Sequence, residues 1–385
     1  MKLNHGHIAL AALLSAGLFT QASAADEAKL KAITDAAIKP VMEKNGIPGL
    51  AVAISVDGEN HVFTYGVTSK STGQPVTPQT LFELGSISKT FTVALSTYAE
   101  MNGQLSLSGK VADYLPSMKG TPFGDVALMH LGTHTAGGFP LQVPDNVETE
   151  QQLLAYLKAW KPSYKAGTHR TYANPSIGML GYVTAKAMGQ SFDDAMQGTL
   201  LPGLGLKNTF TVVPKARMVD YAQGYKRNGD LARVTPAILS SEAYGVKSSA
   251  SDMIRFINAN MGLEKLDGKM QQALLNTHTG YFSVGAMVQD MVWEQYAYPV
   301  ALKTLVDTNS GALLKTVPVS EITPPMKPRQ DVLINKTGST NGFGAYVAFI
   351  PKQKRGVVLL ANKNYPNEDR VALAYEILTA LDKAE

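Results

Sequence analysis

The sequence contains no cysteine. Disulfide bonds, a thiol nucleophile, thiolate metal sites and a lipid anchor on cysteine are therefore excluded together. Charge of either sign is also scarce. The chain has 35 basic and 31 acidic residues, without a basic run, so we expect no nucleic-acid partner. After residue 24, no segment reaches the ~18 consecutive apolar residues that a membrane helix needs.

The first 24 residues have the pattern of a secretory signal peptide. Lys2 supplies a positive start, residues 8–19 form an apolar stretch too short to span a bilayer, and Ala22-Ser23-Ala24 is an A-x-A cleavage site. We therefore expect residues 1–24 to be removed. The mature chain, residues 25–385, is expected in the periplasm, without a membrane anchor.

Hydrophobic periodicity predicts strands at both ends of the mature chain and helices in its middle. Asp57-Gly58 is a strong hairpin signal between the first two strands. The expected strands are 50–56, 61–67, 331–337, 343–350 and 355–361, and the expected helices are 26–45, 88–102, 126–133, 149–160, 176–188, 191–200 and 368–383.

This order of elements predicts an α+β fold within one domain, residues 25–385. The N- and C-terminal strands would pair into one antiparallel sheet flanked by the terminal helices. Residues 26–85 and 205–385 would form this α/β part, and residues 86–204 an inserted, mostly helical part. We expect the active site in the cleft between the two parts.

Three short motifs follow one another along the chain. They are an S-x-x-K at Ser86-Ile87-Ser88-Lys89, a Y-x-N at Tyr172-Ala173-Asn174 and a K-T-G at Lys336-Thr337-Gly338. A helical pattern follows Ser86, which places this serine at a helix N-terminus, where free N–H groups and the helix dipole favour developing negative charge. Lys89 is three residues further and shares the helix face of Ser86. Together the motifs predict a serine nucleophile with a nearby base.

Other catalytic patterns are missing. No G-x-S-x-G occurs, so the sequence does not support an α/β-hydrolase elbow. His130 and His134 are four residues apart but lack the glutamate of the H-E-x-x-H zinc motif. The glycine-rich stretch 338–344 follows K-T-G and leads into a strand, which argues against a phosphate loop. We expect no metal and no cofactor.

The chain resembles the class C (AmpC-type) serine β-lactamases over essentially its whole mature length. The resemblance is carried by residues 82–91, 141–145, 172–178, 242–247, 336–344 and 361–367. It implies the β-lactamase/transpeptidase-like fold. Two positions depart from the family pattern: Ala173 stands where serine is usual, and His134 where tyrosine is common.

The resemblance implies a role for each motif residue. Ser86 would attack the lactam carbonyl, Lys89 and Tyr172 are both candidate bases, and Lys336 would act beside them. The backbone N–H groups of Ser86 and Ser339 would form the oxyanion hole. The substrate would be bound by Gln142, Asn174, Tyr244, Thr337, Gly338, Asn367 and Arg370.

The function implied is hydrolysis of cephalosporins and penicillins by a monomer. Class A enzymes activate the deacylating water with the glutamate of an E-x-x-x-N motif, and this chain has none. The Tyr172/Lys89 cluster would then serve deacylation as well. A D-alanyl-D-alanine carboxypeptidase, a β-lactamase-fold esterase and a penicillin-binding sensor domain are the alternatives that remain open.

Overall fold

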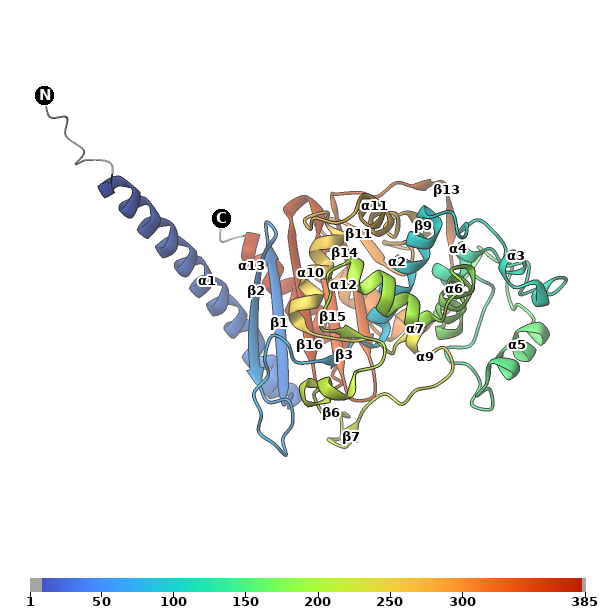
Figure 1. The fold of residues 1–385 in the computed structure, drawn as a ribbon, viewed down its shortest axis with the longest axis horizontal. Helices are drawn as coiled ribbons and strands as arrows, with labels where there is room; N and C mark the ends of the chain where they lie inside the picture. Colours follow the sequence, from blue (N-terminus) through green and yellow to red (C-terminus); the bar gives the residue numbers. More distant parts are fainter. Residues whose placement is uncertain (1–8, 383–385) are drawn as a thin grey trace, which may run out of the picture.

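The computed structural model describes the backbone of residues 9–382 and the side chains of residues 27–311 and 314–382. Its centre is a nine-stranded antiparallel sheet in the order β13-β9-β10-β11-β14-β15-β16-β1-β2 (Figure 1). The strands are β1 (Gly49–Val56), β2 (Glu59–Gly66), β9 (Gly280–Val284), β10 (Met287–Gln289), β11 (Glu294–Ala297), β13 (Ser320–Met326), β14 (Val332–Ser339), β15 (Gly344–Ile350) and β16 (Arg355–Ala361).

Helices surround this sheet and form a separate layer beyond one of its edges (Figure 1). They are α1 (Ala9–Asn45), α2 (Ser88–Met101), α3 (Val111–Tyr114), α4 (Leu128–Gly132), α5 (Glu150–Ala159), α6 (Asn174–Ala187), α7 (Phe192–Ala195), α8 (Leu201–Gly203), α9 (Ser240–Ala243), α10 (Ala250–Asn260), α11 (Gly268–Asn276), α12 (Leu302–Asn309) and α13 (Asn367–Asp382). Short strands outside the main sheet are β3 (Phe82–Glu83), β4 (His169–Arg170), β5 (Thr209–Phe210), β6 (Gly224–Tyr225), β7 (Leu231–Ala232), β8 (Lys247–Ser248) and β12 (Val317–Pro318).

The α+β prediction is confirmed, and so is the pairing of the terminal strands. Asp57 and Gly58 both have positive φ, which is the type I′ turn expected between β1 and β2. Four further strands of the sheet, β9 to β11 and β13, come from residues 280–326, where periodicity gave no signal. Three of these four have five residues or fewer, and β11 carries buried polar side chains instead of an alternating pattern.

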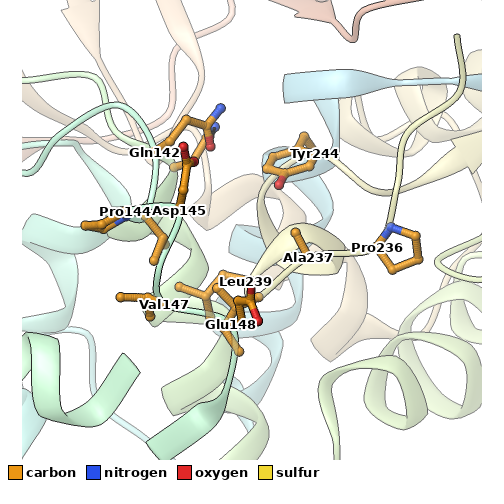
Figure 2. A pocket seen from close by; sticks show the side chains of 12 residues that line it. Gln142, Pro144, Asp145, Val147, Glu148, Pro236, Ala237, Leu239 and Tyr244 are labelled. Carbon is orange, nitrogen blue, oxygen red and sulfur yellow. Dashed lines mark hydrogen bonds between the residues drawn. The ribbon is translucent and has the colours of Figure 1, made fainter. Parts of the chain in front are cut away.

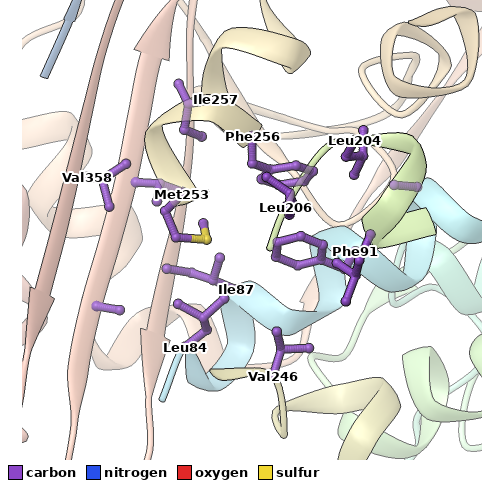
Figure 3. Packing of buried hydrophobic residues seen from close by; sticks show 14 of the residues in the cluster. Leu84, Ile87, Phe91, Leu204, Leu206, Val246, Met253, Phe256, Ile257 and Val358 are labelled. Carbon is purple, nitrogen blue, oxygen red and sulfur yellow. The ribbon is translucent and has the colours of Figure 1, made fainter. Parts of the chain in front are cut away.

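Both faces of the central sheet are covered by hydrophobic clusters. Successive side chains of a strand point to opposite faces, so a strand such as β1 contributes to both clusters. Leu50 and Val52 of β1 pack in one cluster with Ile38 of α1 and Ile377 of α13. Ala51 and Ala53, which point to the other face, belong to a second cluster. Figure 3 shows this second cluster, in which Met253 of α10 lies between Val358 of β16 and Ile87, and Ile257 lies one turn further along α10.

Helix α2 lies between this second cluster and the hydrophobic core of the helical layer. Phe91 and Leu95 belong to the cluster beneath the sheet, where Phe91 stacks on Phe256 with ring centroids 4.2 Å apart. Val93 and Ala99, on the other side of the helix, pack in the core of the helical layer. The helix is therefore fixed from two sides, which gives residues at its N-terminal end a defined position.

The helix expected at 26–45 lies within α1, which begins at Ala9. Its first part extends away from the rest of the molecule (Figure 1). Residues 1–8 of the expected signal peptide lie outside the described residues, and cleavage after Ala24 stays a prediction. Over residues 9–382, no helix has both the length and the hydropathy of a membrane span.

Two glycines bring the start of α2 against β14. Gly85 has φ +53 and opens the 3-10 turn η1 (Gly85–Ile87), and a Cβ there would lie 2.4 Å from the backbone nitrogen of Ser339. A Cβ on Gly338 would lie 2.0 Å from the carbonyl oxygen of Leu84. Real Cβ atoms do not approach backbone this closely, so the contact requires glycine on both sides.

We therefore predict that Gly338→Ala destabilises the fold and displaces η1 from β14. Overpacking typically costs about 1–3 kcal/mol, and a clash with backbone should cost at least the upper value because a carbonyl cannot rotate away as a side chain can. Urea unfolding measures the loss. Gly268→Ala is the matched control, because a Cβ at Gly268 has nothing within 4 Å. Equal stabilities of the two variants would contradict the prediction.

Candidate active site

Ser86 is the one point at which the start of α2 reaches solvent. Between residues 80 and 97 every residue is buried except Ser86, which is half-buried. It lies in η1 immediately before α2, so its backbone N–H is among those left free at a helix start. The sequence expectation of a serine at a helix N-terminus agrees with this position.

Lys89 lies directly behind Ser86 and is fully buried. Its Nζ is 3.0 Å from Ser86 Oγ and 2.7 Å from the carbonyl oxygen of Ala243, at the end of α9. It is also hydrogen-bonded to Tyr172. Burial lowers the pKa of Lys89 to about 8, and Lys336 adds to this, although Tyr172 acts in the opposite direction. Three acceptors thus surround one nitrogen.

Tyr172 completes the cluster from the loop before α6. Its hydroxyl is hydrogen-bonded to Ser86, and its ring centroid lies 5.2 Å from Lys89 Nζ and 5.3 Å from Lys336 Nζ. Burial by itself would raise the pKa of Tyr172. The two lysines and the hydrogen bond from Ser86 outweigh burial and lower this pKa to about 8.

Lys336 is held by a buried carboxylate that sequence analysis did not identify. Glu294, on β11, has Oε1 3.5 Å from Lys336 Nζ and 3.5 Å from Arg170 Nη2, and all three side chains are buried. Arg170 also donates from Nε to Gln289 Oε1 at 2.6 Å. Glu294 therefore partly neutralises two cations beside Tyr172. No motif marks it, because a lone glutamate in a short strand has no recognisable spacing.

The edge of β14 next to Ser86 is open. Strand β11 pairs with β14 only from Val332 to Asn335, whereas β15 pairs with the other edge as far as Ser339. Residues 336–339 of the K-T-G segment therefore have no strand on their β11 side, over the part of the chain that the structure describes. An extended substrate could add to this edge.

The expected substrate-binding residues line two sides of the cleft at Ser86. A cavity of about 500 Å³ contains Gln142, Asn174 and Tyr244, with Gln142 facing Tyr244 across it (Figure 2). Asn174 Nδ2 donates to Gln142 Oε1 at 3.0 Å. A neighbouring cavity of about 560 Å³ contains Ser86, Tyr172, Thr337, Ser339 and Asn367. Ser86 does not line the first cavity, but a third cavity of about 440 Å³ is lined by Ser86, Ser339, Gln142, Asn174 and Tyr244 and so joins the other two.

Arg370 occupies a different position from these residues. It is fully buried, and its Nη1 donates to the carbonyl oxygen of Gly338 at 2.7 Å and to Ser339 Oγ at 2.8 Å. It does not line the 560 Å³ cavity, whereas Arg227 does, and Arg227 is exposed. The structure thus places Arg370 behind the K-T-G strand. The cation facing the cleft from the β6–β7 hairpin was not found from the sequence.

His134 contacts Tyr172, with ring centroids 4.4 Å apart. His130 lies away from it, and its Nδ1 is 2.8 Å from Thr135 Oγ1. Among the side chains that the structure describes, no group of three histidine, aspartate or glutamate residues could hold a metal ion.

The chain is similar to known proteins over almost its whole length. The family model described as beta-lactamase matches residues 34–382. A beta-lactamase of Pseudomonas fluorescens is 46% identical over 355 residues, 92% of this chain and 99% of that protein. A beta-lactamase/D-alanine carboxypeptidase structure from Pseudomonas syringae has TM-score 0.90 and 52% identity, covering 91% and 99% of the two chains. A class C beta-lactamase in complex with cefoxitin has TM-score 0.90 and 48% identity, covering 92% and 99%.

The ion cluster yields a test through Glu294→Gln. Losing the carboxylate leaves two buried cations without their counter-charge, and breaking a buried pair typically costs about 3–5 kcal/mol. Glu294 raises the pKa of Tyr172, so its removal should lower that pKa further. Urea unfolding and a spectrophotometric tyrosine titration measure the two effects. Glu376→Gln, on the exposed face of α13, should change neither, and an unchanged tyrosine titration in Glu294→Gln would contradict this account.

Proposed function

The chain belongs to the beta-lactamase family, and from this premise we propose that Ser86 forms the acyl-enzyme. The protein is a class C serine β-lactamase, an enzyme that hydrolyses β-lactam amides. Cephalosporins and penicillins are the proposed substrates. The observation that carries the proposal is the contact of Ser86 with both Lys89 and Tyr172, at the only residue between 80 and 97 that is not buried.

Tyr172 is the proposed proton acceptor. A serine hydroxyl is a weak nucleophile until a neighbouring group takes its proton. Lys89 Nζ has acceptors at Ser86, Ala243 and Tyr172, an arrangement suited to an ammonium group with three hydrogens. If Lys89 keeps its proton, the Ser86 proton passes to the tyrosinate of Tyr172. The three groups titrate as one coupled cluster.

As Ser86 Oγ attacks, the carbonyl oxygen of the lactam becomes negative, and we propose that the backbone N–H groups of Ser86 and Ser339 stabilise it. The glycine contact between η1 and β14 supports this, since it brings these two backbone segments together. One such donor is typically worth about 3–4 kcal/mol. Collapse breaks the lactam C–N bond, and the ring nitrogen receives the proton from the cluster.

We propose that the two sides of the cleft bind different parts of the substrate. Gln142, Asn174 and Tyr244 would hold the acylamino side chain in their cavity, and the 560 Å³ cavity would hold the carboxylate side through Thr337 and Asn367. Gly338 would pair with the substrate at the open strand edge. Arg370 would act on binding by fixing Gly338 and Ser339. Deacylation would use water activated by Tyr172, because no E-x-x-x-N glutamate exists.

A D-alanyl-D-alanine carboxypeptidase activity is a second candidate. The 52% identical structure from Pseudomonas syringae carries both names, and the open edge of β14 suits an extended peptide. Release of D-alanine from a dipeptide-terminated substrate would show it. A peptidase without lactamase activity would remain acylated by a cephalosporin, whereas a lactamase turns it over.

We further propose that residues 1–24 direct export to the periplasm and are removed, and that the mature enzyme is a monomer. The A-x-A site before Ala25 supports the first point. The intact mass of periplasmic protein and its mass in solution would test both.

Ser86→Ala should abolish turnover and leave the fold intact. The substitution removes the attacking oxygen, and alanine at a helix start should cost only about 1 kcal/mol. Intact-protein mass spectrometry after mixing with a slowly released β-lactam should find an adduct on wild type and none on the variant. Ser88→Ala serves as the control, and an adduct mapped to another serine would refute the assignment.

Tyr172→Phe should slow acylation and deacylation together, because one group serves both steps. A general base typically contributes about 10²–10⁴-fold, and kcat should fall within that range. Wild-type kcat/KM should rise with pH as Tyr172 ionises near its pKa of about 8, and the variant should lose this rise. Pre-steady-state kinetics with a cephalosporin separates the two steps, and near-normal rates for both would leave Lys89 as the base.

A further inference from the structure

His134 holds Tyr172 at three points. Its carbonyl oxygen accepts from the N–H of Thr171 at 2.9 Å, and its Nδ1 accepts from the N–H of Ala173 at 3.2 Å. Its ring lies against the ring of Tyr172, with centroids 4.4 Å apart and planes tilted by 35°. The residue before Tyr172, the residue after it and its own ring are therefore all fixed by one side chain and its backbone.

The backbone of His134 shows that this arrangement is enforced by its surroundings. His134 has φ +61, in the left-handed region that residues other than glycine seldom occupy. Such a conformation persists only where neighbouring contacts hold it. His134 is 1% exposed, so its ring has no free space into which it could leave the contact with Tyr172. The two positions that depart from the family pattern, His134 and Ala173, thus contact each other directly.

The imidazole is neutral in this position. Nδ1 accepts a hydrogen bond, so it carries the lone pair, and the hydrogen of the neutral ring is on Nε2. Burial lowers the pKa of His134 well below its ordinary value, and Arg170, Lys89 and Lys336 act in the same direction. Glu294 faces the same group of cations and offsets part of their charge. A protonated ring would lose the bond from Ala173 and add a further cation.

We infer that His134 is a positioning residue, which as a neutral hydrogen-bond acceptor keeps the hydroxyl of Tyr172 between Ser86, Lys89 and Lys336. The inference rests on the proposed function, in which Tyr172 is the base. His134 lines none of the cavities at Ser86, and it contacts the ring and the loop of Tyr172, so we place its effect on catalysis through Tyr172. Its acceptor atom is the essential feature, since without it the buried N–H of Ala173 has no partner and the Tyr172 loop is free to shift.

Two substitutions separate the acceptor from the ring. His134→Asn places an amide oxygen at the position of Nδ1, and asparagine tolerates a left-handed backbone. His134→Phe keeps a ring against Tyr172 and removes the acceptor. His134→Gly, which accommodates φ +61 without strain, removes both and serves where the phenylalanine variant does not fold. His130→Asn is the control, four residues earlier and bonded to Thr135 instead.

Steady-state kinetics over pH with a cephalosporin is the measurement. A 1 Å misplacement of a catalytic group can cost about 10²-fold, so kcat of His134→Phe and His134→Gly should fall about 10- to 100-fold. KM should change little, and the pH at which kcat/KM rises should shift. His134→Asn should keep most of the activity and the wild-type pH profile, as should His130→Asn.

The inference is overturned if His134→Phe or His134→Gly is folded and keeps wild-type kcat and pH profile, or if His134→Asn is as slow as they are. Adding His134→Gly to Tyr172→Phe should slow the enzyme no further, and a further tenfold loss there would also overturn it. If Tyr172→Phe alone has normal rates, the proposed base role fails instead. The two failures are therefore distinguishable.

Discussion

The site depends on one backbone contact, the approach of the turn at Gly85 to the strand at Gly338. Neither position has room for a Cβ, and the nearest atom that each Cβ would meet is a backbone atom of the other segment. This contact fixes the start of α2 against the sheet, so the serine that follows Gly85 lies beside the open edge of β14. Helix α2 can hold its place because hydrophobic clusters enclose it from both sides.

Around this contact the chain buries several charged side chains. Lys89, Lys336 and Arg170 would each be costly to bury without a partner. Glu294 pairs with two of them, and the carbonyl of Ala243 and the hydroxyls of Ser86 and Tyr172 satisfy the third. The surplus of positive charge that remains falls on Tyr172 and lowers its pKa against the effect of burial. The same positive charges also lower the pKa of His134. They therefore favour the tyrosinate form of Tyr172 and the neutral form of His134.

Support for this cluster comes from elements distant in sequence. Arg370 on α13 bonds Gly338 and Ser339, α9 supplies the acceptor for Lys89, and the short strand β11 ends so that residues 336–339 keep a free edge. Chemistry at the cleft therefore relies on residues that never face it.

The sequence by itself determined the fold class, the terminal strands and the three motifs. The apolar runs of β1, β15 and β16 and the Asp57-Gly58 turn are local signals. S-x-x-K, Y-x-N and K-T-G are recognisable because their spacing is fixed within a few residues. Tertiary structure alone decided the rest. Packing brings together residues that are far apart in the chain: Glu294 pairs with Lys336 and Arg170, and His134 contacts Ala173. Packing also places Arg370 behind the K-T-G strand and leaves Arg227 exposed. These positions depend on how the strands and helices pack against one another, and no pattern within a few residues of sequence specifies which distant residues will meet.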